Sequence, residues 1–186
     1  MLDASRAAYR SFLAVWHGDC PLVLDSGCGT GDSTAFLAGR FPESLVVGID
    51  QSQARLKRFG KPVPSNMLLL RARAQDFWRL LRADNIRPAH HFLLYPNPWP
   101  KVVHLKRRWH GHPVFPELLA LGGRLELRTN WHIYAEEFRL AVGICGSEAP
   151  PVVSFSVLLP LSPFERKYAE SGHRLYRLGI NLEESA

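Results

Sequence analysis

The stretch Leu22-Val23-Leu24-Asp25-Ser26-Gly27-Cys28-Gly29-Thr30-Gly31 decides the fold of this chain. Its apolar start ends in an acid, and three glycines then follow at alternate positions. A short apolar run bounded by turn residues predicts a buried strand, and the glycines predict a tight turn. The next residues, 32–40, predict a helix whose N-terminal amides point back at the turn. A strand, a turn and a helix in this order are common at nucleotide-binding sites.

A second acid makes this indication more specific. The apolar run 45–49 ends in Asp50, which a strand-turn-helix-strand unit places beside the glycine turn, where a carboxylate can bind two ribose hydroxyls. Gly27, Gly29 and Gly31 depart from the G-x-G-x-x-G spacing of dinucleotide sites. The pattern resembles the turn of class I methyltransferases that bind S-adenosylmethionine (SAM). A dehydrogenase-type turn and a glycine-rich loop without a ligand are the alternatives.

The rest of the chain alternates expected helices and strands. Further strands are expected at 67–70, 91–94, 124–129, 152–159 and 175–180, and further helices at 4–16, 52–59, 77–83, 115–121 and 131–144. Residues 160–172 are expected to form a long polar loop. This order predicts one Rossmann-like α/β domain over residues 1–186, with a mostly parallel seven-stranded sheet and an antiparallel hairpin at its C-terminal edge.

Composition limits the class of partner and the location. The net charge of +6 is concentrated in the segment 101–108 and favours an anionic partner such as nucleic acid. Three cysteines without paired spacing favour a reducing cytoplasm, and no apolar run is long enough to span a membrane. His104, His110 and His112 lack a cysteine or carboxylate at ligand spacing, so we expect no metal. We also expect a monomer.

Polar residues gather where the first four strands end. These positions carry Asp25, Asp50, the turn 73–75 and the turn 96–99, and carboxyl ends of parallel strands share one sheet edge. Asn97 stands between two prolines, which stiffen the backbone and favour a fixed amide for a base edge. Trp99 can stack on a base, and the alternative is that its ring fills the sheet edge. The basic segment 101–108 is positioned to contact phosphates, or it is a solvated loop.

These motifs together resemble the bacterial tRNA (guanine-N7-)-methyltransferases of the TrmB type. The residues that carry the resemblance lie at 24–31, 48–50, 96–101, 104–108, 129–131, 134–136 and 162–167. The resemblance implies SAM as cofactor, tRNA as partner and methyl transfer to N7 of a guanine.

The resemblance also implies roles for single residues. Asn97 would be the catalytic residue that positions the base. The expected cofactor contacts are Asp25, Gly27, Gly29, Gly31, Asp50, Ser52, Arg73, Ala74 and Leu94. The expected RNA contacts are Trp99, Lys101, Arg107, Arg108, Asn130, Ser162 and Glu165. Of these, Ser162 and Glu165 would close over the nucleotide from the polar loop.

Three positions depart from the family pattern. Asn97 and Asn130 stand where the family has Asp, and Arg73 replaces a residue that is usually Asp or Asn. Guanine N7 carries a lone pair and no proton, so methyl transfer depends on in-line placement more than on a strong base. Two alternatives stay open: methylation of an exocyclic amino group of another base, and an inert RNA-binding paralogue. A small-molecule methyltransferase fits poorly with the basic segment.

Overall fold

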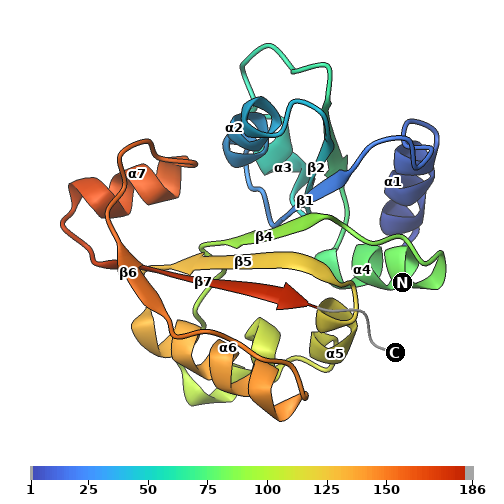
Figure 1. The fold of residues 1–186 in the computed structure, drawn as a ribbon. Coiled ribbons are helices and arrows are strands. Elements are labelled where there is room, and N and C mark those ends of the chain that lie inside the picture. The colour runs from blue at the N-terminus through green and yellow to red at the C-terminus, as the bar shows by residue number, and fades with distance from the viewer. Residues whose placement is uncertain (1, 183–186) are drawn as a thin grey trace.

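A seven-stranded sheet runs through the molecule, whose computed structural model describes residues 2–182 (Figure 1). Its spatial order is β3-β2-β1-β4-β5-β7-β6. The strands are β1 (Leu22–Ser26), β2 (Leu45–Asp50), β3 (Met67–Arg71), β4 (His90–Leu94), β5 (Gly123–Thr129), β6 (Val153–Phe155) and β7 (Leu175–Leu182). The first five strands are parallel, and β7 pairs antiparallel with both β5 and β6. The expected mostly parallel sheet with antiparallel C-terminal strands is confirmed.

The strand order contains a switch point between β1 and β4. The chain moves outward from β1 to β2 and β3, and then returns to place β4 on the other side of β1. Helices on the two sides of such a point leave a crevice outside the carboxyl ends of the strands, where open α/β sheets bind ligands. The glycine turn at 27–31 follows β1 and therefore lies at this crevice.

Helices cover both faces of the parallel part of the sheet. They are α1 (Asp3–Leu13), α2 (Asp32–Arg40), α3 (Gln53–Leu56), α4 (Ala74–Ala83), α5 (Phe115–Leu119), α6 (His132–Ile144) and α7 (Pro163–Glu170). Side chains of α1, α4, α5 and α6 belong to the larger core cluster, while those of α2 belong to a smaller cluster on the opposite face. Within residues 2–182, no helix has the length and apolarity needed to cross a membrane.

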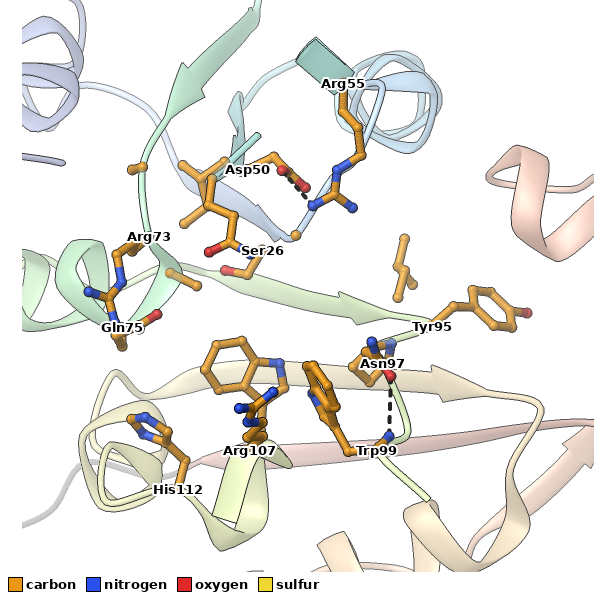
Figure 2. A pocket seen from close by; sticks show the side chains of 18 of the residues that line it. Ser26, Asp50, Arg55, Arg73, Gln75, Tyr95, Asn97, Trp99, Arg107 and His112 are labelled. Carbon is orange, nitrogen blue, oxygen red and sulfur yellow. Dashed lines mark hydrogen bonds and ion pairs between the residues drawn. The ribbon is translucent and has the colours of Figure 1, made fainter. Parts of the chain in front are cut away.

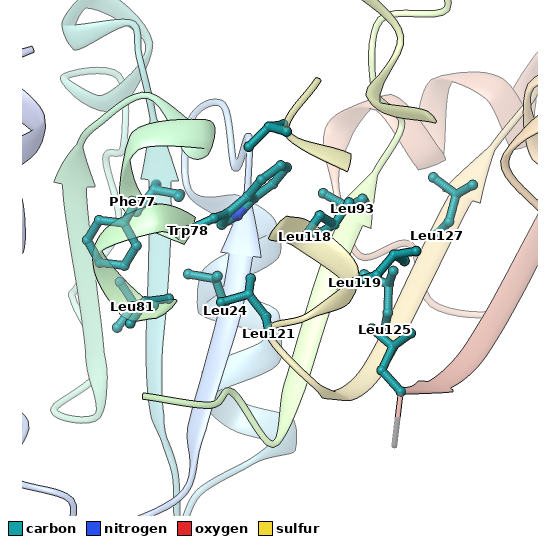
Figure 3. Packing of buried hydrophobic residues seen from close by; sticks show 14 of the residues in the cluster. Leu24, Phe77, Trp78, Leu81, Leu93, Leu118, Leu119, Leu121, Leu125 and Leu127 are labelled. Carbon is teal, nitrogen blue, oxygen red and sulfur yellow. The ribbon is translucent and has the colours of Figure 1, made fainter. Parts of the chain in front are cut away.

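Side-chain alternation in β1 explains the two clusters. Leu24 belongs to the larger cluster and its neighbour Val23 to the smaller, because successive strand residues point to opposite faces. A continuous apolar run is therefore what a strand covered on both faces requires. Figure 3 shows Trp78 of α4 and Leu118 of α5 packed on the same side of the sheet as Leu24. Fully burying a side chain of this size contributes roughly 1.5–3 kcal/mol.

The C-terminal part of the chain differs from expectation. The expected polar loop at 160–172 contains the helix α7, which Ser162 caps by accepting a hydrogen bond from the backbone of Glu165. A short helix with polar residues on most sides lacks the apolar periodicity that identifies longer helices. The strand expected at 152–159 is only β6, and Leu158 beyond it is 95% exposed.

Smaller differences concern helix ends and the basic segment. The helix expected at 52–59 ends at Leu56, and the leading helix ends at Leu13 rather than Trp16. The basic segment forms two 3₁₀ turns, η1 (Val102–Arg107) and η2 (Trp109–Gly111). These turns fix the backbone from which the side chains of the basic segment extend.

Replacing Gly123 with alanine should lower the free energy of unfolding by at least about 2 kcal/mol. Gly123 opens β5 with φ +71°, and an added Cβ would collide with the carbonyl oxygen of Pro88. The matched control is Gly179→Ala in β7, where no atom lies within 4 Å of the added Cβ. Urea denaturation of both variants measures the difference, and equal losses would contradict this prediction.

Candidate active site

A cavity of about 610 Å³ opens at the carboxyl edge of the sheet, at the switch point (Figure 2). Residues from the ends of β1, β2 and β4, the turn before α4, and the segment around η1 and η2 line it. Eight of the residues expected to form the site line this one cavity: Gly27, Asp50, Arg73, Ala74, Leu94, Asn97, Trp99 and Arg107. The structure therefore brings the expected cofactor and base positions together.

Asp50 connects the glycine turn to α3. Its Oδ2 accepts a hydrogen bond from the Gly29 amide at 3.0 Å, and its Oδ1 accepts one from the Ser52 amide at 2.7 Å. The Arg55 guanidinium forms an ion pair with Oδ1 at 2.9 Å. Since a carboxylate can accept about four hydrogen bonds, the side chain retains capacity for a ligand hydroxyl. Ser52 itself caps α3 and lies outside the cavity lining.

Asp25 lies beneath the glycine turn and outside the cavity lining. It is fully buried, and its Oδ2 accepts hydrogen bonds from the hydroxyls of Ser33 at 2.7 Å and Thr34 at 2.8 Å. These bonds attach the first turn of α2 to β1. Asp25 therefore supports the turn from below, where the sequence suggested a direct cofactor contact.

Gly29 and Gly31 also shape the turn and stand outside the lining. Gly31 is the N-cap of α2 in the left-handed conformation, with φ +91°. A side chain at that position would press on Leu69 and Phe59. Gly27 and Gly29 have positive φ and open space where a Cβ would stand, so a ligand can approach the backbone there.

Asp25→Asn should remove a pH dependence of stability between about pH 4 and pH 6. Burial raises the pKa of Asp25 from 3.8 to about 6, and its Oδ1 lacks a hydrogen-bond partner within residues 2–182. Because the folded pKa lies above the unfolded one, the folded state favours the protonated acid. The wild type should therefore gain about 3 kcal/mol relative to the variant as the pH falls from above 6 to below 4.

Urea denaturation of both proteins at a series of pH values measures this difference. The asparagine keeps an acceptor for Ser33 and Thr34, and the histidines that also titrate are common to both proteins. Parallel stability profiles for the two proteins would contradict the prediction.

Asn97 occupies a stiff turn after β4. Tyr95 and Trp99, two residues away on either side, have positive φ of 52° and 44°, a strained conformation for non-glycine residues that clusters at functional sites. The Asn97 Oδ1 accepts a hydrogen bond from the Trp99 amide at 3.2 Å (Figure 2). The Nδ2 group of this cavity-lining side chain is then the donor available to a ligand.

The two neighbouring arginines of the basic segment have different surroundings: one lines the cavity and the other is buried in the protein. Arg107 lines the cavity and lies over the Trp99 ring, 4.8 Å from its centroid. Arg108 is buried, pairs with Glu137 of α6, and donates to the Trp99 carbonyl oxygen from Nη2 at 3.2 Å. The expected phosphate contact of Arg108 is therefore wrong for this conformation, because its guanidinium is already used inside the protein. Lys101 is exposed and lies outside the lining.

Glu165 is a buried anchor instead of a residue that closes over the nucleotide. Its Oε1 accepts hydrogen bonds from Tyr95 at 2.8 Å and Arg128 at 2.9 Å, and its Oε2 accepts one from the Leu161 amide at 2.7 Å. The side chain is 0% exposed, which contradicts its expected RNA contact. It joins α7 to β5 and to the residue that precedes the Asn97 turn.

Two other expected RNA contacts also lie outside the cavity. Ser162 caps α7, so its hydroxyl accepts a hydrogen bond from the helix backbone. The Nδ2 atom of Asn130 lies 3.4 Å from Nδ1 of His173. Neither residue lines the cavity, so any contact they make with RNA belongs to the outer surface.

Sequence reasoning missed a polar network in the cavity wall. The Ser26 hydroxyl accepts a hydrogen bond from Trp78 Nε1 at 3.0 Å and lies 2.8 Å from His91 Nε2. Burial lowers the pKa of His91 to about 3, so the ring is neutral, and its tautomer decides whether Nε2 donates the hydrogen bond to the Ser26 hydroxyl or accepts it. A histidine within an otherwise apolar strand was the available signal. The network fixes Ser26 where it lines the cavity.

The cavity also includes Arg55, Trp109 and His112, which no motif indicated as site residues. Gln75 and Tyr134 line it too; they lie in the stretches 73–75 and 134–136, but the motifs gave neither of them a role. The Tyr134 hydroxyl accepts a hydrogen bond from the Trp109 amide at 3.2 Å, which fixes this wall. Among the residues that the structure describes, no group of three or more potential ligands could hold a metal ion.

The fold is that of class I methyltransferases. A structure of an antibiotic-related methyltransferase superposes with a TM-score of 0.68 at 17% identity, over 97% of this chain and 96% of that chain. A second structure, the 16S rRNA methyltransferase KamB, has a TM-score of 0.67 at 17% identity, over 98% and 95%.

Sequence comparison identifies the family. The family described as "Putative methyltransferase" matches residues 19–147, and the chain belongs to this family. A tRNA (guanine-N(7)-)-methyltransferase of Polaromonas naphthalenivorans is 34% identical over 134 residues, which cover 68% of this chain and 54% of that protein. Enzymes with the same name from Treponema pallidum and Paracidovorax citrulli are 29% and 30% identical, covering 85% and 94% of this chain.

The chain is shorter than these relatives. The matches span 54%, 66% and 71% of the Polaromonas, Treponema and Paracidovorax proteins.

Proposed function

We propose that this protein transfers a methyl group from SAM to N7 of a guanine in tRNA. The observation that carries the proposal is one cavity lined by Gly27 and Asp50 on one side and by Asn97 and Trp99 on another. The names of the sequence relatives support guanine N7 and tRNA as the target. We also propose that the protein acts as a monomer in the cytoplasm, where its three cysteines would remain reduced.

The cavity residues fit SAM. Asp50 has acceptor capacity left for ribose hydroxyls, and the open space at Gly27 and Gly29 leaves room for the methionine part. Ala74 and Leu94 supply apolar walls for the adenine. When bound, SAM supplies a methyl group on a positively charged sulfur. The protein's task is to hold the acceptor base in line with that methyl group.

Asn97 suits a guanine that presents its N7 edge. Guanine carries two acceptors there, N7 and O6. Because Asn97 Oδ1 is already bonded to the Trp99 amide, its Nδ2 can donate to O6 and leave N7 free to react. Trp99 provides a stacking surface for the base. The target must leave its stack in the tRNA, which is least costly in an irregular loop.

Incubation with labelled SAM and an unmodified tRNA transcript tests the proposal. We expect the label on N7-methylguanosine after digestion to nucleosides and mass spectrometry. Asp50→Ala serves as the cofactor-binding control in the same assay. Label found only on an exocyclic amino group, or only on a small molecule, would overturn the assignment. Binding of both SAM and tRNA without any transfer would identify an inert paralogue.

A further inference from the structure

The cavity carries more positive charge than its cofactor needs. Arg55, Arg73 and Arg107 line it, and within residues 2–182 Asp50 is its single carboxylate. Arg55 already neutralises Asp50 through their ion pair at 2.9 Å. SAM carries a sulfonium, an ammonium and one carboxylate, so its net charge is positive. With that carboxylate counted, Arg73 and Arg107 still leave the cavity with an excess of positive charge that a further anion can balance.

These two arginines are held in place by neutral partners. With its amide oxygen facing Arg73, Gln75 accepts hydrogen bonds from Nη2 at 2.6 Å and from Nε at 3.0 Å. Arg107 lies against the Trp99 ring. A neutral amide and an aromatic ring orient a guanidinium group without neutralising its charge. The positive charge therefore remains available to bind an anionic ligand.

His112 adds a directed donor at the same end of the cavity. Its Nδ1 accepts a hydrogen bond from the Val114 amide at 3.1 Å, so in the neutral ring the proton is on Nε2. Burial lowers the pKa of His112, and the nearby cations Arg79 and Arg73 lower it further. Figure 2 shows Arg73, Gln75, Arg107 and His112 around one end of the cavity.

We propose that Arg73, Arg107 and His112 form a subsite for a backbone phosphate of the RNA substrate, next to the methylated nucleotide. Guanidinium groups bind phosphate oxygens with paired, charge-assisted hydrogen bonds, and the His112 Nε2–H group can donate one more. This inference rests on the proposed function, because it takes RNA as the substrate. It moves Arg73 from the expected cofactor contacts to the RNA contacts.

The salt dependence of tRNA binding tests the subsite without requiring catalysis. Binding of a tRNA transcript is measured over a range of salt concentrations with S-adenosylhomocysteine present. Arg73→Gln should weaken binding about 5–10-fold at low salt and reduce the slope of log K against log salt by about 0.7–0.9, the loss of one phosphate contact. Arg73→Lys should retain the slope, since the charge remains.

Two controls separate the subsite from general charge effects. Arg10→Gln on α1 makes the same change in net charge at an exposed position outside the cavity, and should leave the affinity within about twofold. Calorimetry with S-adenosylhomocysteine should show that Arg73→Gln binds this cofactor product within about twofold of the wild type.

Two outcomes would overturn the subsite, and a third would overturn only the proposed function. A loss of S-adenosylhomocysteine affinity with an unchanged salt slope would place Arg73 against the cofactor. Inorganic phosphate that displaces tRNA at matched ionic strength, with no change of slope in Arg73→Gln, would identify a site for a free anion. A wild type that binds tRNA with the expected slopes but methylates no guanine N7 would defeat the proposed function and leave this subsite intact.

Discussion

Asn97→Ala should lower kcat/KM for tRNA methylation about 100–1000-fold while leaving SAM affinity within about twofold. The variant removes the Nδ2 donor proposed for guanine O6 and the Oδ1 acceptor that holds the Trp99 amide at 3.2 Å. Both losses act on the placement of the base, and methyl transfer is sensitive to the alignment of the reacting atoms. Steady-state kinetics with tRNA and calorimetry with SAM measure the two effects.

Asn97→Asp is the matched control for this prediction. It keeps an acceptor for the Trp99 amide but replaces the Nδ2 donor with a negative charge, so it tests donation to guanine O6 against the Asp that the family pattern has at this position. Weaker SAM binding in Asn97→Ala would contradict the assignment to the base. A large gain of activity from an inactive wild type in Asn97→Asp would instead favour the inert paralogue.

Glu165→Ala should lower the free energy of unfolding by about 3 kcal/mol, because it leaves buried polar groups without their partner. The carboxylate accepts hydrogen bonds from Tyr95, Arg128 and the Leu161 amide, and it is fully buried. Arg128 keeps its ion pair with Glu126 at 2.7 Å, which limits the loss. Chemical denaturation followed by circular dichroism measures the change.

The control is Glu170→Ala, at the exposed C-terminal end of the same helix, where a change within about 0.5 kcal/mol is expected. Glu165→Gln retains hydrogen-bonding capacity without the charge and should fall between the two. An unchanged stability combined with a higher KM for tRNA would show that Glu165 contacts RNA after all.

Local patterns were enough to predict the parallel half of the fold and the part of the site built on it. The apolar run of β1, the glycines after it and the apolar run of β2 that ends in Asp50 are signals that each extend over only a few neighbouring residues. The carboxyl ends of parallel strands meet at one edge, so Asp50 and Asn97 could be placed together before any contact was known. The cavity contains both.

Partners distant in the chain decided which charged residues face a ligand. Arg107 and Arg108 are adjacent in a basic segment, yet one lines the cavity and the other pairs with Glu137 on α6. The same holds for Glu165, whose partner Tyr95 is 70 residues away. Whether a charge is buried depends on a partner that only the folded chain supplies.

The sequence by itself determined the sheet, the glycine turn and the strand ends that carry Asp50 and Asn97, because these depend on side-chain periodicity and backbone freedom over short stretches. Only the tertiary structure decided that Asp25 supports the turn from below, that Glu165 anchors α7, and that the cavity extends to His112. These properties depend on contacts between side chains that are far apart in the chain, and the local sequence pattern does not determine such contacts.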